Sequence, residues 1–312
     1  MKNILLTGAS GFIGKHLFEK IKLNYQVHLL LRSPSKIHEY THVYENIDAS
    51  SDFSTALGSI DCVIHLAARA HILKEQAALP LEQFRAVNRD LTLNLAKQAA
   101  KNGVKRFIYI SSIGVNGVCN ESPFKFSDDP MPVDDYALSK LEAEQDLRCL
   151  AKETGMEVVI IRPPLVYGKG APGNFERLVK LTSRNLPLPL GAINNKRSFV
   201  SVDNLTDLIV TCIDHPQAKN ETFLVSDDED VSTSQLLVKM LSAQGKPNML
   251  IPIPVNILKL LGSIFKRKAV IERFTNSLTV DIEHTKKTLG WLPPISLDEG
   301  IARCFNENYK DK

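Results

Sequence analysis

Short apolar runs alternate with helical patterns along the first half of the chain. The runs have the length of buried strands and fall at residues 3–7, 26–31, 61–66, 106–111 and 157–162. Apolar positions with helical spacing lie between them, at residues 14–23, 81–102 and 136–154. This alternation predicts an α/β fold built on a parallel, doubly wound sheet with right-handed crossovers.

A glycine-spaced turn joins the first predicted strand to the first predicted helix. Glycines at this spacing let the backbone turn sharply and approach a dinucleotide pyrophosphate, while the helix start supplies unpaired N–H groups. The motif alone also fits a helix start with flexible glycines, so its meaning depends on the rest of the chain. The expected contacts to the pyrophosphate are Gly8, Ser10, Gly11, Phe12, Ile13 and Gly14.

A tyrosine and a lysine four residues apart follow the apolar run at 106–111. Tyr136 and Lys140 share one face of a helix, so the ammonium can lie beneath the phenol and lower its pKa from about 10. Ser112 stands at the end of the preceding strand, where its hydroxyl could hydrogen-bond the reacting oxygen. A Tyr-x-x-x-Lys sequence by itself fits a solvated helix face. With the glycine turn ahead of it, the set predicts Ser112, Tyr136 and Lys140 as catalytic residues.

With both motifs present, the chain resembles the extended short-chain dehydrogenase/reductase family, in particular its nucleotide-sugar epimerases, dehydratases and 4-ketoreductases. The family's serine, tyrosine and lysine fall on Ser112, Tyr136 and Lys140. The resemblance covers nearly the whole chain and implies a Rossmann-type doubly wound sheet with a smaller C-terminal substrate lobe. Further matching landmarks are His65-Leu66-Ala67-Ala68, Asn88, Arg162-Pro163, Val166-Tyr167-Gly168, Arg197-Ser198-Phe199-Val200 and Leu289-Gly290-Trp291.

Cofactor choice depends on the end of the second predicted strand. An NAD enzyme typically places an acidic residue there for the ribose 2′-hydroxyl, whereas this chain has Arg32, with Lys36 close behind. A guanidinium suits a 2′-phosphate, so NADP(H) is favoured; NAD(H) stays possible because Arg32 could be a simple surface residue. The resemblance implies that the contacts outside the glycine turn are Arg32, Asp48, Ala49, Leu66, Ala67, Ala68, Asn88, Tyr136, Lys140 and Pro163.

The resemblance also implies contacts to a nucleotide-sugar substrate. Arg197 matches an arginine that grips the nucleotide diphosphate, and Ser112 would contact the sugar. Leu165 stands where the family has an asparagine, so other groups must supply that hydrogen bond. Further diphosphate or base contacts are expected from Asn174, Phe175 and Arg273.

Three reactions are open to such a family member. Dehydratases carry Asp-Glu where this chain has Ile113 and Gly114, neither of which can move a proton, so dehydration is not expected. Arg32 favours a 4-keto-6-deoxy nucleotide-sugar reductase that makes surface-polysaccharide precursors. The alternative is a UDP-hexose or UDP-N-acetylhexosamine 4-epimerase with retained NAD. A non-catalytic NADP(H)-sensing protein is more distant, because the Tyr136 and Lys140 pair argues against it.

Interruptions near residue 165 suggest a domain boundary. Pro163-Pro164 and the glycines between 168 and 173 break the strand–helix alternation. We expect residues 1–165 to form the dinucleotide-binding domain and 166–312 mainly the substrate lobe, with segments possible that return to the first domain.

Composition agrees with an enzyme rather than a nucleic-acid-binding protein. The chain has 312 residues, a net charge of +3 and 23% charged residues, so no nucleic-acid partner is expected. Its five cysteines are scattered without C-x-x-C pairs, which favours reduced thiols and no metal site. The first strand begins with no signal peptide ahead of it, and we expect a cytoplasmic protein with no integral membrane segment.

Two apolar segments suggest interaction surfaces. The stretch Val255 to Arg273 is too short and too often interrupted by charge to span a bilayer. A helix of the substrate lobe with a solvated basic end is the favoured interpretation, and a membrane-surface helix stays as an alternative. Family members often pair two helices in an intermolecular four-helix bundle, so we expect a homodimer through the helices at 91–99 and 138–150.

Overall fold

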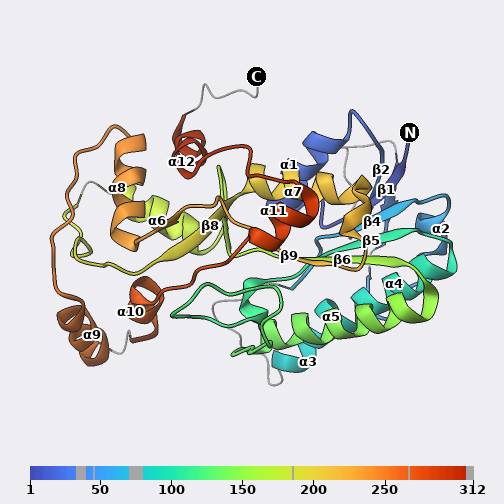
Figure 1. The fold of residues 1–312 in the computed structure, drawn as a ribbon, viewed down its shortest axis with the longest axis horizontal. Helices are drawn as coiled ribbons and strands as arrows, with labels where there is room; N and C mark the ends of the chain where they lie inside the picture. Colours follow the sequence, from blue (N-terminus) through green and yellow to red (C-terminus); the bar gives the residue numbers. More distant parts are fainter. Residues whose placement is uncertain (33–39, 45, 70–79, 185, 266–267, 307–312) are drawn as a thin grey trace.

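A seven-stranded parallel sheet forms the larger part of the molecule (Figure 1). The computed structural model describes residues 1–32, 40–44, 46–69, 80–184, 186–265 and 268–306. The strand order is β3-β2-β1-β4-β5-β6-β9, and each neighbouring pair is parallel. The strands are β1 (Asn3–Thr7), β2 (Gln26–Leu31), β3 (Thr41–Val43), β4 (Cys62–His65), β5 (Arg106–Ile110), β6 (Glu157–Arg162) and β9 (Thr222–Leu224). Chain order reverses between β1 and β4, and ligands of open α/β sheets bind at such a point, outside the carboxyl ends of the strands.

Helices cover both faces of this sheet. Successive side chains of a strand point to opposite faces, and in these strands the side chains on both faces are apolar and need cover. Ile4 and Leu6 of β1 belong to one core cluster and Leu5 to the other, and all three are fully buried. One face is covered by α1 (Phe12–Ile21), α7 (Val202–Asp214) and α11 (Glu283–Leu289). The other face is covered by α2 (Ser54–Leu57), α4 (Leu91–Lys101) and α5 (Asp135–Thr154). The predicted doubly wound α/β fold is therefore confirmed.

The helix expected at 81–102 is divided by a π-helical turn. It comprises α3 (Pro80–Arg85), the π turn Ala86–Asp90, and then α4. A π turn accommodates one additional residue per turn and commonly lies at a functional site. Here it contains Asn88, whose fully buried side chain is used by neighbouring segments.

A smaller lobe is built around a three-stranded sheet, ordered β10-β8-β7. The strands are β7 (Leu165–Tyr167), β8 (Arg197–Ser201) and β10 (Asp230–Val231), with β8 parallel to β7 and antiparallel to β10. The lobe's helices are α6 (Asn174–Ser183), α8 (Thr233–Ala243), α9 (Val255–Ile264), α10 (Lys268–Thr275) and α12 (Leu297–Phe305). Short 3-10 turns lie at Ile113–Val115 and Pro216–Ala218. Strand β9 and helices α7 and α11 come from beyond residue 166 and pack on the large sheet.

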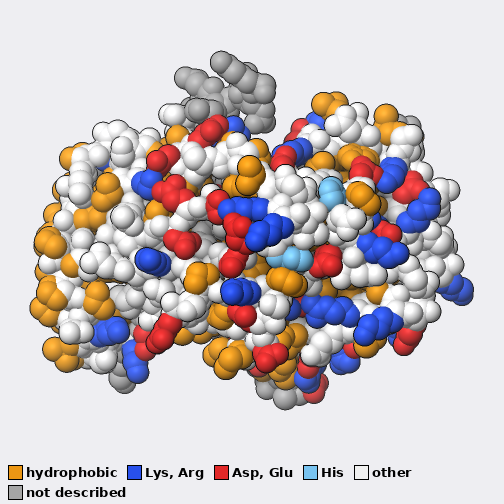
Figure 2. Space-filling model, in the orientation of Figure 1, with side chains coloured by type: hydrophobic (Ala, Val, Ile, Leu, Met, Phe, Trp, Pro, Cys, Tyr) orange, Lys and Arg blue, Asp and Glu red, His pale blue; other side chains and the backbone are white. Residues whose placement is uncertain are grey.

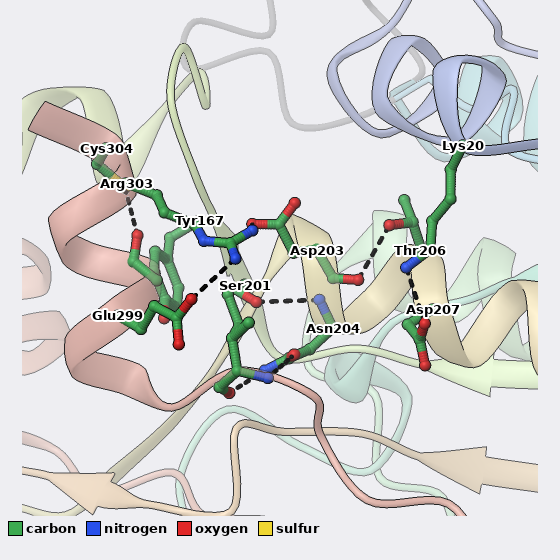
Figure 3. A network of polar contacts seen from close by, with 12 residues as sticks. Lys20, Tyr167, Ser201, Asp203, Asn204, Thr206, Asp207, Glu299, Arg303 and Cys304 are labelled. Carbon is green, nitrogen blue, oxygen red and sulfur yellow. Dashed lines mark hydrogen bonds and ion pairs between the residues drawn. The ribbon is translucent and has the colours of Figure 1, made fainter. Parts of the chain in front are cut away.

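Polar contacts attach the last helix to the centre of the molecule (Figure 3). The Arg303 guanidinium on α12 reaches Asp203 on α7 at 3.3 Å and Glu299 at 2.8 Å. Ser201 caps α7 by accepting a hydrogen bond from the Asn204 N–H at 3.0 Å. These contacts join α12 to the start of α7, where the small sheet leads into a helix of the large domain.

Candidate active site

The glycine turn after β1 has the shape that a dinucleotide pyrophosphate requires. Gly8 has a φ of +71°, and a Cβ there would lie 2.7 Å from the Ala67 nitrogen. A Cβ on Gly14 would lie 2.2 Å from the Gly8 oxygen, so only glycine lets the helix pack this closely. The α1 N-cap, Gly11, makes no side-chain capping hydrogen bond, which leaves the N–H groups of the first turn available to an anion. The turn therefore fits the cofactor that its sequence suggested.

A buried histidine holds the neighbouring loop beside the glycine turn. The His65 ring contacts the Thr7 hydroxyl through Nδ1 at 2.8 Å and the Thr92 hydroxyl through Nε2 at 2.9 Å. The Ala67 N–H donates to the same Thr7 oxygen at 3.2 Å. Burial, and secondarily the charge of Lys140, lowers the pKa of His65 to about 3, so the ring is neutral. This network fixes residues 66–68, where cofactor contacts are expected.

The buried side chain of Asn88 also holds the loop after β4 in place. Its carboxamide oxygen accepts from the Arg69 N–H at 2.8 Å, and its nitrogen donates to the Arg69 carbonyl at 3.1 Å and the Ser139 hydroxyl at 3.0 Å. These three hydrogen bonds hold the amide within the chain, and the expected contact of Asn88 with the cofactor stays a prediction. Pro163 is also buried, and its carbonyl accepts from the Ile113 N–H at 3.0 Å.

The three expected catalytic residues lie where β5 ends and α5 begins. The Ser112 hydroxyl accepts from the Gly114 N–H at 3.1 Å, so its own hydrogen remains to be donated elsewhere. The Lys140 ammonium donates to the Ile110 carbonyl at 2.8 Å and lies 4.4 Å from the centre of the Tyr109 ring. Tyr136 stands in the first turn of α5, whose start is capped by Asp134.

The protonation of this set differs from the sequence prediction. Burial lowers the pKa of Lys140 to about 7, and the nearby Glu144 carboxylate opposes that shift. Burial, together with the charge of Asp134, raises the pKa of Tyr136 to about 12. The expected lowering of the phenol pKa by Lys140 is thus corrected, because desolvation dominates and the ammonium is directed at Ile110. The chain's own side chains hold the phenol in its protonated form.

A buried ion pair below the catalytic set was missed by sequence reasoning. Glu144 is 0% exposed and Arg162 2%, and the guanidinium donates to both carboxylate oxygens at 2.9 and 2.6 Å. The Ser111 hydroxyl donates to Glu144 at 2.6 Å, and Arg162 donates to Asn116 at 2.9 Å. The available signal was Arg162 itself, because an arginine directly after the apolar run at 158–161 requires a buried partner.

The residues expected at the adenosine end are exposed. Arg32 directly follows β2, and its side chain is open to solvent; Lys36 lies outside the described residues. Asp48 and Ala49 lie in a turn beyond β3, which already ends at Val43. The Asp48 carboxylate accepts from the Ser50 N–H at 2.8 Å and hydroxyl at 2.7 Å, and these hydrogen bonds lower its pKa.

Two of the expected substrate contacts are brought together in the lobe. The Arg197 guanidinium donates to the Arg273 carbonyl at 2.9 Å, and burial lowers the pKa of Arg197. Asn174 is exposed at the start of α6. The Phe175 ring is 1% exposed and packs against Tyr167 in the lobe core, and the expected contact of Phe175 with the substrate stays a prediction. Leu165 lies in β7, partly buried against that core.

Most of the apolar residues that suggested a dimer interface are buried inside the chain itself. Leu91, Leu95 and Leu147 are buried in the core beneath the sheet, where α4 and α5 pack together. The argument that these helices carry surplus apolar surface is therefore corrected. Leu93 is only partly buried, and the homodimer remains a prediction.

Comparisons with known proteins agree with this geometry. The model of the NAD dependent epimerase/dehydratase family matches residues 4–226. A UDP-glucose 4-epimerase from Vibrio cholerae is 49% identical over 308 residues, covering 97% of this chain and 94% of that protein. An N-acetyl-α-D-glucosaminyl-diphospho-ditrans,octacis-undecaprenol 4-epimerase from Escherichia coli O157:H7 is 27% identical, covering 98% and 95%. The structure of a UDP-N-acetylglucosamine 4-epimerase from Bacillus cereus shares the fold, with a TM-score of 0.81, 21% identity and 98% of each chain covered.

Proposed function

Because the chain belongs to the NAD-dependent epimerase/dehydratase family, we propose that it is a UDP-hexose 4-epimerase that retains NAD between turnovers. It is an enzyme of the extended short-chain dehydrogenase/reductase type that acts on a nucleotide sugar. The observation that carries the finer proposal is the 49% identity, over nearly the full length of both chains, to a UDP-glucose 4-epimerase. This epimerase proposal takes precedence over the 4-keto reductase that Arg32 favoured, because a single exposed arginine weighs less than similarity along the whole chain.

The dinucleotide would be held by the glycine turn, by the loop at 66–68 and by Lys140. When bound, NAD supplies a reversible two-electron oxidation of the C4 alcohol. The glycine turn and the start of α1 would bind its pyrophosphate. Arg32 is available to the adenosine end, where a guanidinium can stack on adenine as well as pair with a 2′-phosphate.

Tyr136 would take the proton from the sugar O4 during oxidation. It would return the proton to O4 once the 4-keto sugar has rotated and presents its other face. The pKa of Tyr136 is about 12 in the chain alone, so it must be lowered before the phenol can accept a proton as phenolate near neutral pH. In the chain alone the Lys140 ammonium is directed at the Ile110 carbonyl, so it would have to turn toward the phenol to lower that pKa, and Glu144 favours the charged form that this requires. The Ser112 hydroxyl, accepting from Gly114, can donate its hydrogen to O4 and fix the orientation of the sugar.

The proposal also has consequences for assembly and substrate range. A UDP-N-acetylhexosamine is the second substrate class, and the homodimer, the cytoplasmic location and the division at residue 165 are proposed along with it. NADP(H) in place of NAD is the competing cofactor, supported by Arg32 alone.

One assay separates the reactions. Purified protein is incubated without added cofactor with UDP-glucose or UDP-N-acetylglucosamine, and with NADPH and dTDP-4-keto-6-deoxyglucose, with products identified by NMR. We expect C4 inversion of a UDP-sugar and no net consumption of NADPH. Reduction of the keto-sugar without any inversion would instead support the reductase. The Tyr136→Phe variant serves as a folded control that should do neither.

A further inference from the structure

Helix α9 presents apolar side chains to solvent where a surface helix ordinarily presents polar ones. Leu258 and Gly262 are its buried residues and face the lobe. The outward face consists of Ile257, Leu260, Leu261 and Ile264, spaced i, i+3, i+4 and i+7, followed by Phe265. Their side chains are 47, 62, 43, 64 and 69% exposed, in the same order. We call these five residues the α9 face.

The α9 face forms a stripe along one side of a single helix of the substrate lobe, because its positions follow helical spacing. Figure 2 shows hydrophobic side chains gathered along the side of the molecule where Figure 1 places α9. Asn256, Lys259 and Ser263 form a narrow polar flank, also at helical spacing. Scattered exposed leucines are normal on a protein surface, whereas a contiguous apolar stripe marks a site of interaction.

Charge around the α9 face indicates which partner covers it. Residues 255–273 contain five basic residues and one acidic residue, in a chain whose total net charge is only +3. Lys259 is exposed on α9, and Lys268 at the start of α10 is 73% exposed while pairing with Glu272 at 3.7 Å. An apolar stripe flanked by basic residues is typical of helices that lie in the surface of an anionic bilayer.

A second copy of the chain fits the α9 face less well. An isologous dimer places the same patch against itself, so the basic residues of the two copies would come together. Helix α9 has ten residues, and among the described residues there is no helix with the length and apolar character needed to cross a membrane. The helix is therefore suited to lying on a bilayer.

We propose that the α9 face docks the enzyme on the surface of an anionic lipid bilayer. Docking would involve α10 as well, because α10 follows α9 directly and packs against it. The Arg273 carbonyl on α10 accepts from Arg197, so the expected diphosphate-binding end of the substrate site lies beside the docking element. This inference does not depend on which C4 reaction the enzyme performs.

The test is sedimentation of the purified full chain with lipid vesicles. We expect binding to phosphatidylglycerol-containing vesicles, weaker binding to pure phosphatidylcholine vesicles, and strong weakening near 1 M salt, where the screening length falls to about 3 Å. Leu260→Glu should weaken vesicle binding by about tenfold or more, since it removes an inserted leucine and adds repulsion. The matched control is Leu23→Glu, which changes a leucine that is 77% exposed between α1 and β2, on the large domain and away from α9.

Activity and mass measurements make the outcomes distinct. Both variants should retain turnover of a water-soluble nucleotide sugar, because neither residue lies in the active site. Lys259→Glu is a second variant, expected to weaken binding to anionic vesicles only. Absence of vesicle binding by the wild type, or equal binding by Leu260→Glu and Leu23→Glu, would overturn the proposal. A third contrary outcome is that the wild type does not bind vesicles and Leu260→Glu has a lower mass in light scattering than the wild type. That result would show that the α9 face contacts a second copy of the chain.

Discussion

Replacing Glu144 by glutamine tests the buried ion pair beneath the catalytic residues. Glutamine has nearly the same shape, so the change removes a charge without opening a large cavity. One carboxylate oxygen becomes an NH₂ group, and it faces the Arg162 guanidinium whichever oxygen it replaces, since Arg162 now donates to both at 2.9 and 2.6 Å. The guanidinium then stays buried without a counter-charge.

The size of the effect follows from burial. Removing one partner of a buried pair costs about 3 to 5 kcal/mol, and no discount for solvent applies because the two side chains are 0% and 2% exposed. At about 2.1 cal/mol/K per residue, unfolding of 312 residues gives a fall in melting temperature of about 5 to 8 °C. Glu142→Gln, on the same helix, is the control: Glu142 pairs with Arg85 at the surface, with 18% and 35% exposure, and should cost less than about 1 kcal/mol.

Calorimetry measures the stability effect, and a pH–rate profile measures the catalytic one. Glu144 favours the charged form of Lys140, so its loss should lower the pKa of that lysine further from about 7. If charged Lys140 is needed, the alkaline fall of kcat/KM moves to lower pH in Glu144→Gln and stays in place in Glu142→Gln. Equal melting temperatures and superimposable profiles for the two variants would refute the reasoning.

Four further predictions follow. Tyr136→Phe should lower turnover by about 10² to 10⁴ with nucleotide affinity retained in calorimetry, and near-normal turnover would remove the phenol from the mechanism. If Arg32 pairs with a 2′-phosphate, Arg32→Asp should weaken NADP(H) by about 10- to 150-fold and leave NAD(H) less affected; unchanged affinities would make Arg32 a surface residue. His65 has a pKa of about 3 in the folded chain against 6.5 in the unfolded chain, so between these values the free energy of unfolding should fall by about 1.4 kcal/mol for each pH unit of acidification. Urea unfolding should show this slope in the wild type and not in His65→Asn, and parallel curves for the two proteins would contradict it. Light scattering should give a dimer mass at micromolar concentration, against which a constant monomer mass would count.

Local sequence patterns were sufficient for the sheet and for the glycine turn. Strands β1, β2 and β6 lie at the predicted residues because buried parallel strands consist of nearly unbroken apolar runs. The positions of Gly8 and Gly14 could be read from sequence because their tight contacts lie within one strand–turn–helix unit or with the adjacent strand. The role of Asn88 could not, since the partners of its side chain, Arg69 and Ser139, come from distant segments.

Side-chain roles that depend on burial were the ones the sequence could not supply. Phe175 matches a family position, yet its ring is buried in the core of the smaller lobe. The pKa of Tyr136 depends on desolvation, which no spacing rule reveals. Glu144 lies one helical turn after Lys140 and looks like a surface residue until β6 brings Arg162 beside it. The leucines of α4 and α5 suggested a dimer because their burial under the sheet was unknown.

The most direct test of the central claim follows the hydrogen at C4. Purified enzyme is incubated with UDP-galactose carrying deuterium at C4, with no cofactor added, and the products are examined by NMR and mass spectrometry. A UDP-hexose 4-epimerase that retains NAD should produce UDP-glucose with the deuterium still on C4 and one tightly bound NAD per chain. An unchanged substrate, together with NADPH-dependent reduction of a 4-keto-6-deoxy nucleotide sugar by the same preparation, would contradict the account.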